Sequence, residues 1–367
     1  MDISYYQDIV KESLVFLESL KKQSTLSFYP SKKGLTQYGK RLELGFVCYA
    51  LKLYKLTGEW DKIEINLKEE FIRFLNQFQN INTNFPENYF IDNELVNSYS
   101  KIFTSQNYKY IAKNVVNQFT KKNYPTKSTR LNEAVNAENK QVISTLHELE
   151  RTNERKIFKL YESDQELLQY LNSLNWSLPW SAGAQFSSLC VYTATQNFQY
   201  EKTLLSFIDS MLNNETGSYH TNNLRDNRQV INGAMKVISG LDWLNVEIHK
   251  PKKLIDFCLN ETPELEGCDI VDFVYVLYKC SQYTDYKRKE INNIFKILLT
   301  EIMKLYLLED KGFSYYKNKS QTHYYGVKIT KGIKTADIHG TMLCVWAIVM
   351  MLNQLDESSN SFKVIKP

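Results

Sequence analysis

The sequence is poor in the residues that make tight turns. Of its 367 residues, only 13 are glycine and 7 are proline. An all-β fold needs many such turns between short strands, so this composition disfavours it and favours long helices. Alternation typical of strands never extends beyond a few residues, whereas helical periodicity recurs along the chain.

Strong charge, cysteine pairs and long apolar runs are also absent. A net charge of +4, from 45 basic and 41 acidic residues, is too small to indicate a nucleic-acid partner. The most apolar window, 342–352, is shorter than the ~20 residues of a membrane-spanning helix, and the N-terminus lacks the pattern of a secretory signal. The six scattered cysteines include no CxxC pair, so we expect reduced core thiols in a cytoplasmic protein without membrane insertion. The oligomeric state is left open.

The predicted helices fall into two classes. Residues 43–56 are apolar on nearly all sides, whereas residues 66–78 carry one apolar stripe. The two classes alternate along the chain, which is typical of an array of helical hairpins. A closed ring explains the split, because its inner helices are buried all round and its outer helices face solvent. We therefore predict an all-α fold, an (α/α)-toroid of about six hairpins around a central cavity.

Two repeated phrases support this array. The loops NFPENYF (84–90), ETGSYHTN (215–222) and KGFSYYKN (311–318) each place aromatics before a polar-started helix. The phrase ENKQVI (138–143) returns as DNRQVI (226–231), and we expect both to begin equivalent helices, with Asp226 as a cap and Gln229 reaching back to it. We expect one domain over 1–367: hairpins assigned by helical rhythm only in 1–130, recognisable repeats in 131–354, and a tail in 355–367.

The repeats resemble those of the terpenoid cyclase and protein prenyltransferase superfamily. The resemblance covers roughly residues 130–354 and is clearest in GFSYYKNKSQTHYYG and ADIHGTMLCVWAIVMM, within 311–354. It implies an α/α-toroid and makes an enzyme the favoured interpretation. The acidic DxDD and DDxxD motifs of terpenoid cyclases are missing, which disfavours cyclisation.

The same resemblance implies a zinc ion. Prenyltransferases bind it with a carboxylate and a cysteine two residues apart, and with a distant histidine. Glu266, Cys268 and His339 match that set, although the family has Asp in place of Glu266 and no glycine between the histidine and Thr341. Three protein ligands with an open fourth position are typical of catalytic zinc. An ordinary half-buried cysteine beside capping acids is the competing interpretation.

Acid–base residues cluster near predicted helix starts. Asp337 is expected to cap the last apolar helix and His339 to lie in its first turn, where they could act as an orienting group and a general base. His323 and Tyr324 follow in a repeat loop and could pass a proton, as in α/α-barrel polysaccharide lyases and sugar epimerases. Asp269, at another helix start, would supply a second carboxylate. Caps and loop packing are the alternatives.

Substrate contacts are predicted from cationic and aromatic side chains. Arg225, Arg228 and Lys236 flank one helix start and could bind a phosphate, diphosphate or uronate. Aromatic side chains near the loops could stack on a sugar or an isoprenoid. These are Trp180, Tyr219, His220 and Tyr325.

Three functions remain open. A carbohydrate-active enzyme (lyase, hydrolase or epimerase) would use the tyrosine-rich cavity and the acid–base residues. A prenyltransferase-like enzyme would use an isoprenoid and the zinc site. A third hypothesis is a non-catalytic toroid that binds or scaffolds the components of a modification pathway.

Overall fold

The computed structural model describes residues 2–79, 84–102, 126–221, 224, 226–356 and 362–367, and within them the chain is all-α, as predicted. Two hairpins of two-residue strands are the only paired strands in this part, β1 (Tyr306–Leu307) with β2 (Gly312–Phe313) and β3 (His323–Tyr324) with β4 (Val327–Lys328). The described α-helices are α1 (Ile3–Glu18), α2 (Gln37–Arg41), α3 (Leu44–Leu56), α4 (Ile65–Asn76), α5 (Asn93–Ile102), α7 (Lys127–Glu148), α8 (Asp164–Ser173), α9 (Pro179–Gln196), α10 (Glu201–Ser210), α11 (Arg228–Trp243), α12 (Pro251–Leu259), α13 (Gly267–Ser281), α14 (Arg288–Ile302) and α15 (Ile338–Leu355).

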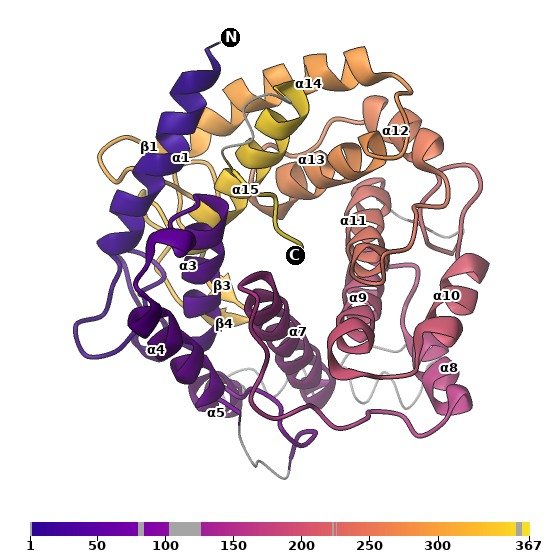
Figure 1. Cartoon of the computed structure of the whole chain (residues 1–367), viewed down its shortest axis with the longest axis horizontal. Coiled ribbons are helices and arrows are strands. Elements are labelled where there is room, and N and C mark those ends of the chain that lie inside the picture. The colour runs from indigo at the N-terminus through magenta and orange to yellow at the C-terminus, as the bar shows by residue number, and fades with distance from the viewer. Residues whose placement is uncertain (1, 80–83, 103–125, 222–223, 225, 357–361) are drawn as a thin grey trace.

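Six helices contact one another in a closed cycle. Helix α3 packs against α7, and the contacts continue through α9, α11 and α13 to α15, which packs back on α3. Helices α1, α4, α8, α10, α12 and α14 lie outside this cycle (Figure 1). The N-terminal part of the chain supplies α3 and therefore contributes to the ring instead of only covering it.

Burial separates the two helix classes as their sequences suggest. All thirteen residues of α3 are buried, whereas α14 buries only one stripe. Helix α15 is long and apolar enough to cross a membrane, but 83% of its length is buried inside the structure. Its inner position, between α3 and α13, accounts for its composition.

The repeated loops form one recurring structural unit. After an outer helix, the chain makes a short antiparallel bridge that places an aromatic ring in the core. The aromatic partners in these bridges are Phe28, Phe90, Tyr219 and Phe313, and each is fully buried. The copy at Phe28 carries no glycine or proline signal within its loop, which is why the sequence pattern missed it.

The doubled phrase does not begin two equivalent helices, so that prediction is wrong. Helix α7 begins after Thr126, whose hydroxyl caps it, and ENKQVI lies in its middle. Helix α11 does begin at Arg228, whose backbone N–H donates to the Asp226 carboxylate. Gln229 does not reach back to the cap, because its side-chain oxygen accepts from the Trp180 N–H.

Two segments far apart in the sequence, residues 30–35 and 330–338, are joined beside the start of α15. Ser31 pairs with Asp337 and Leu35 with Thr330 as antiparallel bridges. The Ile338 N–H donates to the Pro30 carbonyl, and the Ser31 hydroxyl donates to the Ala336 carbonyl. This seam fixes the first turn of α15, which carries His339.

Candidate functional site

Four inner helices begin at the same end of the ring. The starts of α9 and α11 are joined by the Trp180–Gln229 hydrogen bond, at 3.3 Å. Those of α11 and α13 are joined by Arg228 and Asp269, at 2.7 Å. The loop before α15 lies against α13, because the Gly267 N–H donates to the carbonyl of Tyr315. Side chains of the first turns therefore gather in one region.

Asp337 caps α15, as predicted, and its carboxylate also holds the preceding loop. One oxygen accepts from the Gly340 N–H at 2.8 Å. The other accepts from the N–H groups of Tyr315, at 2.7 Å, and Gln321, at 3.0 Å. Burial raises the pKa of Asp337 to about 6 against these donors. With both oxygens occupied by backbone, Asp337 positions Tyr315 and has no oxygen left to orient an imidazole.

His339 lies between two tyrosine rings. Its imidazole stacks on Tyr49 of α3, with ring centroids 4.4 Å apart and planes 9° apart, and Tyr315 lies 5.1 Å away at a tilt. Burial, together with the charges of Lys236 and Lys52, lowers the pKa of His339 to about 3. The imidazole is thus neutral, and its buried Nδ1 has no hydrogen-bond partner within the described ranges. A neutral, partly exposed imidazole is a proton acceptor.

Cys268 and Tyr315 form a pair beside this imidazole. The thiol sulfur lies 3.1 Å from the Tyr315 hydroxyl. Two glycines permit the contact. A Cβ on Gly340 would lie 2.4 Å from the backbone nitrogen of Tyr315, which is too close, and Gly267 has a φ of +61°, which favours glycine. Burial, and then the charge of Asp272, raise the pKa of Cys268 to about 11. The thiol therefore stays protonated.

The predicted zinc ligands do not fit that ion. The Cys268 sulfur lies 3.1 Å from the Tyr315 hydroxyl and is engaged with that phenol. The Glu266 carboxylate accepts from the Lys317 N–H at 2.8 Å. Nowhere in the described residues do three or more His, Cys, Asp or Glu side chains form a group that could hold a metal. Glu266, Cys268 and His339 are not a metal set, and no step is assigned to zinc.

Three lysines converge inside the ring near His339. Lys52 of α3 is only 6% exposed and donates to the Ser144 hydroxyl. Lys236 of α11 lies 3.7 Å from Asp272 of α13. Lys140 of α7 is half-buried, and no hydrogen bond or ion pair joins its ammonium to any residue that the structure describes.

Lys140 lies close enough to groups on the other inner helices to interact with their charges. Burial, and then the charges of Lys236 and Lys52, lower the pKa of Lys140, which is also influenced by Cys190 and Asp272. Those groups stand on four other inner helices, so Lys140 faces inward. Burial raises the pKa of Asp272 to about 6, with Lys236 opposing it, and one Asp272 oxygen has no partner among the described residues. Cationic groups outnumber carboxylates in this region.

Arg228 and Asp269 form the rim of the site. The Arg228 guanidinium donates to Glu264 at 2.6 Å and to Asp269 at 2.7 Å. Asp269 also accepts from the Asn232 amide at 2.6 Å. These pairs neutralise one another, so Arg228 is not a free cation and Asp269 is not a free carboxylate.

The predicted His323–Tyr324 pair is split by strand geometry. Successive side chains of a strand point to opposite faces, and here His323 is exposed while Tyr324 is buried. The Tyr324 hydroxyl donates to the buried Glu138 carboxyl at 2.9 Å. Tyr325 is half-buried, its ring centroid lies 4.5 Å from that of Tyr324, and its carbonyl accepts from the Tyr99 hydroxyl.

The remaining predicted contacts lie elsewhere. Tyr219 is fully buried, with its hydroxyl 2.9 Å from Nδ1 of His249. His220 is held within its own loop by Thr216 and the Thr221 carbonyl. Trp180 is half-buried at the start of α9, and Arg225 lies outside the described residues.

A cavity of about 860 Å³ opens beside the N-terminal ends of α7 and α9. Its wall includes Tyr89, Tyr161 and Tyr170, and the last two stack with ring centroids 5.2 Å apart. Asn136 and Gln185 also line it, and their side chains are hydrogen-bonded at 3.4 Å. Asn136 lies one helical turn before Lys140 on α7, but none of the three lysines belongs to the wall of this cavity.

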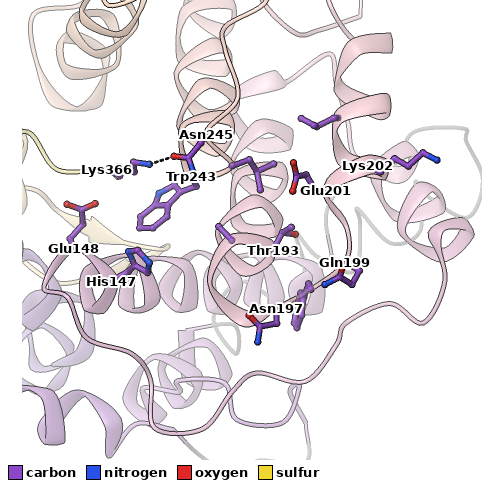
Figure 2. A pocket seen from close by; sticks show the side chains of 14 residues that line it. His147, Glu148, Thr193, Asn197, Gln199, Glu201, Lys202, Trp243, Asn245 and Lys366 are labelled. Atoms are coloured by element: carbon purple, nitrogen blue, oxygen red, sulfur yellow. Dashed lines mark hydrogen bonds between the residues drawn. The ribbon is translucent and has the colours of Figure 1, made fainter.

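A second cavity, of about 1010 Å³, lies at the opposite ends of α7, α9 and α11 (Figure 2). His147, Glu148 and Lys366 stand on one side of it, and Glu201 and Lys202 on the other. The Lys366 ammonium donates to the Asp242 carbonyl at 2.6 Å and lies over a tryptophan ring. This cavity is the larger, but its charges are paired or exposed. We place the site at the other end, where buried charges lack partners.

Four residues of the site were not predicted: Tyr49, Lys52, Lys140 and Tyr315. The lysine at 52 carried a visible signal, since it interrupts a segment that is apolar on nearly all sides. Lys140 lies in the doubled phrase ENKQVI, whose repetition indicates architecture and gives no sign of a site. Tyr315 belongs to a repeat loop whose equivalents are structural, and sequence alone gave no reason to separate it from them.

The comparisons with known proteins add little. No protein-family model matches the chain, and no curated protein sequence does. A solved structure described as a polysaccharide lyase is similar over 97% of this chain and 98% of its own, at 12% identity and a TM-score of 0.46. Similarity at this level carries no argument about function. The resemblance to terpenoid cyclases and prenyltransferases stays a prediction.

Proposed function

We propose that the chain is an enzyme that abstracts a proton from an acidic sugar, in an elimination or epimerisation reaction. The observation that carries this proposal is a neutral imidazole, His339, held between two tyrosine rings and close to the charges of Lys236 and Lys52. The same region contains a base, phenols and an excess of cationic groups. These are the parts that proton transfer beside a sugar carboxylate requires.

His339 is suited to the role of base. Its depressed pKa keeps it unprotonated at neutral pH, and because Nδ1 is buried, Nε2 would be the nitrogen that accepts the proton. Stacking on Tyr49 fixes the ring plane. Tyr315 is protonated and lies beside the imidazole, so it can return a proton to a leaving oxygen.

The lysines supply the second requirement. Removing a proton next to a carboxylate builds negative charge on that carboxylate, and preorganised cations stabilise it. Lys52 is buried and Lys236 is half-buried, on two different inner helices, and the Asp272 carboxylate lies 3.7 Å from the Lys236 ammonium. An acidic substrate would balance this charge.

Hydrolysis is less well supported. It uses two carboxyl groups on either side of the scissile bond. Asp269 is bound by Arg228 and Asn232, and both oxygens of Asp337 accept from backbone. Asp272 alone has an unpartnered oxygen.

The test is an assay of the purified chain against a panel of polyuronates, with neutral polysaccharides and a prenyl diphosphate in parallel. Elimination creates a conjugated double bond that absorbs in the ultraviolet, and epimerisation exchanges the abstracted proton for solvent deuterium. We expect one of these signals with a polyuronate, and its loss in His339→Gln.

The matched control is His147→Gln, at the other end of the ring. It should keep the signal. If no polyuronate gives either signal, or if thermal stabilisation appears with the prenyl diphosphate alone, the proposal fails.

A further inference from the structure

We propose that Lys140 is a nucleophilic amine that forms an imine with an anionic carbonyl compound bound by Lys52 and Lys236. This inference rests on the lysine cluster, not on the elimination chemistry of the proposed function. Its ligand class is a small aldehyde or ketone with a carboxylate, such as the open-chain form of an acidic sugar or a 2-oxo acid.

The geometry separates Lys140 from its two neighbours. Lys236 shares Asp272, and Lys52 donates to Ser144, so each has a partner that anchors its ammonium. Lys140 has no such partner in the part of the chain that the structure describes, and it keeps partial exposure inside the ring. It also lies one helical turn before Ser144, which accepts from the Lys52 ammonium, and one turn after Asn136, which lines the 860 Å³ cavity.

Its neighbours also favour the free amine. A lysine next to other cations, in a partly desolvated site, loses its proton more readily and becomes a nucleophile. Burial, Lys236 and Lys52 all act in this direction on Lys140. The same two cations would hold the carboxylate of the ligand, and so bring its carbonyl carbon to the amine.

The chemistry needs no further reagent. The amine nitrogen attacks the carbonyl carbon and forms a C–N bond, giving a carbinolamine. Loss of the former carbonyl oxygen as water, with the two nitrogen protons, leaves the C=N bond. An imine draws electrons from the adjacent carbon and acidifies its C–H bond, and His339 belongs to the same cluster and could accept that proton.

The experiment is reductive trapping on the full chain. The protein is incubated with glyoxylate and cyanoborohydride, digested, and mapped by mass spectrometry. We expect the adduct to form faster at Lys140 than at Lys202, an exposed lysine of α10. A decrease of one unit in the pKa of Lys140 increases the fraction of free amine at neutral pH about tenfold. With the neutral aldehyde glycolaldehyde, Lys140 should no longer be labelled faster than Lys202.

Two variants complete the test. Lys140→Arg keeps the charge but cannot form an imine, so the fast adduct should vanish while Lys202→Arg retains it. If Lys140→Arg does not fold, the pH dependence in the wild-type chain decides: labelling of Lys140 should persist to lower pH than labelling of Lys202. Equal rates at both lysines, or equal rates with both aldehydes, overturn the proposal. Glyoxylate has no eliminable group, so this result is independent of the polyuronate assay.

Discussion

A histidine lies against an aromatic ring at each end of the helical ring, yet the surrounding charges differ. His147 contacts Trp243 with centroids 5.1 Å apart, near Lys366, whose ammonium is held by the Asp242 carbonyl. His339 stacks on Tyr49, near lysines that outnumber their carboxylates. The larger cavity is at the first end and the unpaired buried charge at the second. The size of a cavity and the presence of groups that could carry out a reaction are therefore separate properties in this fold.

The largest expected difference between the two ends is in activity. His339→Gln should lower kcat/KM on a responsive polyuronate about 10²–10⁴-fold, because it removes the proton acceptor. His147→Gln should change it less than about twofold, since that imidazole is exposed and lies at the end of the ring away from the proposed site. Steady-state kinetics of both variants decide the comparison. Equal losses would mean that the two ends are not functionally distinct.

Stability should also distinguish the ends, through Asp337. Asp337→Ala leaves the N–H groups of Gly340, Tyr315 and Gln321 without their acceptor inside the protein. We expect the free energy of unfolding to fall by about 2–4 kcal/mol, as measured by urea denaturation. Glu148→Ala, at the other end, should cost less because Glu148 accepts from one backbone N–H, that of Lys366, and otherwise interacts only with the charges of neighbouring lysines. A loss at Asp337 no larger than at Glu148 would contradict its structural role.

Asp337 also shows how far sequence reasoning reached. The polar start of an apolar helix was enough to predict the cap, because capping depends on local spacing. It could not reveal that both oxygens are occupied, since two of the donors come from the loop 315–321, folded back by long-range contacts. The helix classes were predictable for the same local reason. The lysine cluster was not, because it is assembled from three helices far apart in sequence.

The pH dependence of stability gives a third comparison. In the unfolded chain His339 takes up a proton near its ordinary pKa of 6.5, but in the folded chain only near 3. Its contribution to stability is therefore present above pH 6.5 and is lost as the pH falls toward 3. The stability difference between wild type and His339→Gln should shrink over this range, by at most ~1.4 kcal/mol per pH unit.

The control for this slope is His147→Gln. Desolvation also lowers the pKa of His147, but this side chain is exposed, so its slope should be shallower. Denaturation curves at several pH values measure both. A difference between wild type and His339→Gln that stays constant with pH would contradict the neutral, buried imidazole.

The smallest expected effect has the opposite sign and addresses the lysines. An ammonium that is held near two others without a partner destabilises the fold, so Lys140→Met should raise the free energy of unfolding by about 1 kcal/mol. Lys366→Met should not, because that ammonium has a carbonyl, an amide oxygen and an indole ring as partners. Thermal melts in low salt would show the difference in stability change between the two variants. Added sulfate should reduce this difference, because it screens the three lysines and binds to them. If the Lys140→Met variant is less stable than the wild type, Lys140 packs as a structural residue. If the variant is more stable and also loses the reductive trapping, the fold retains this charge for binding.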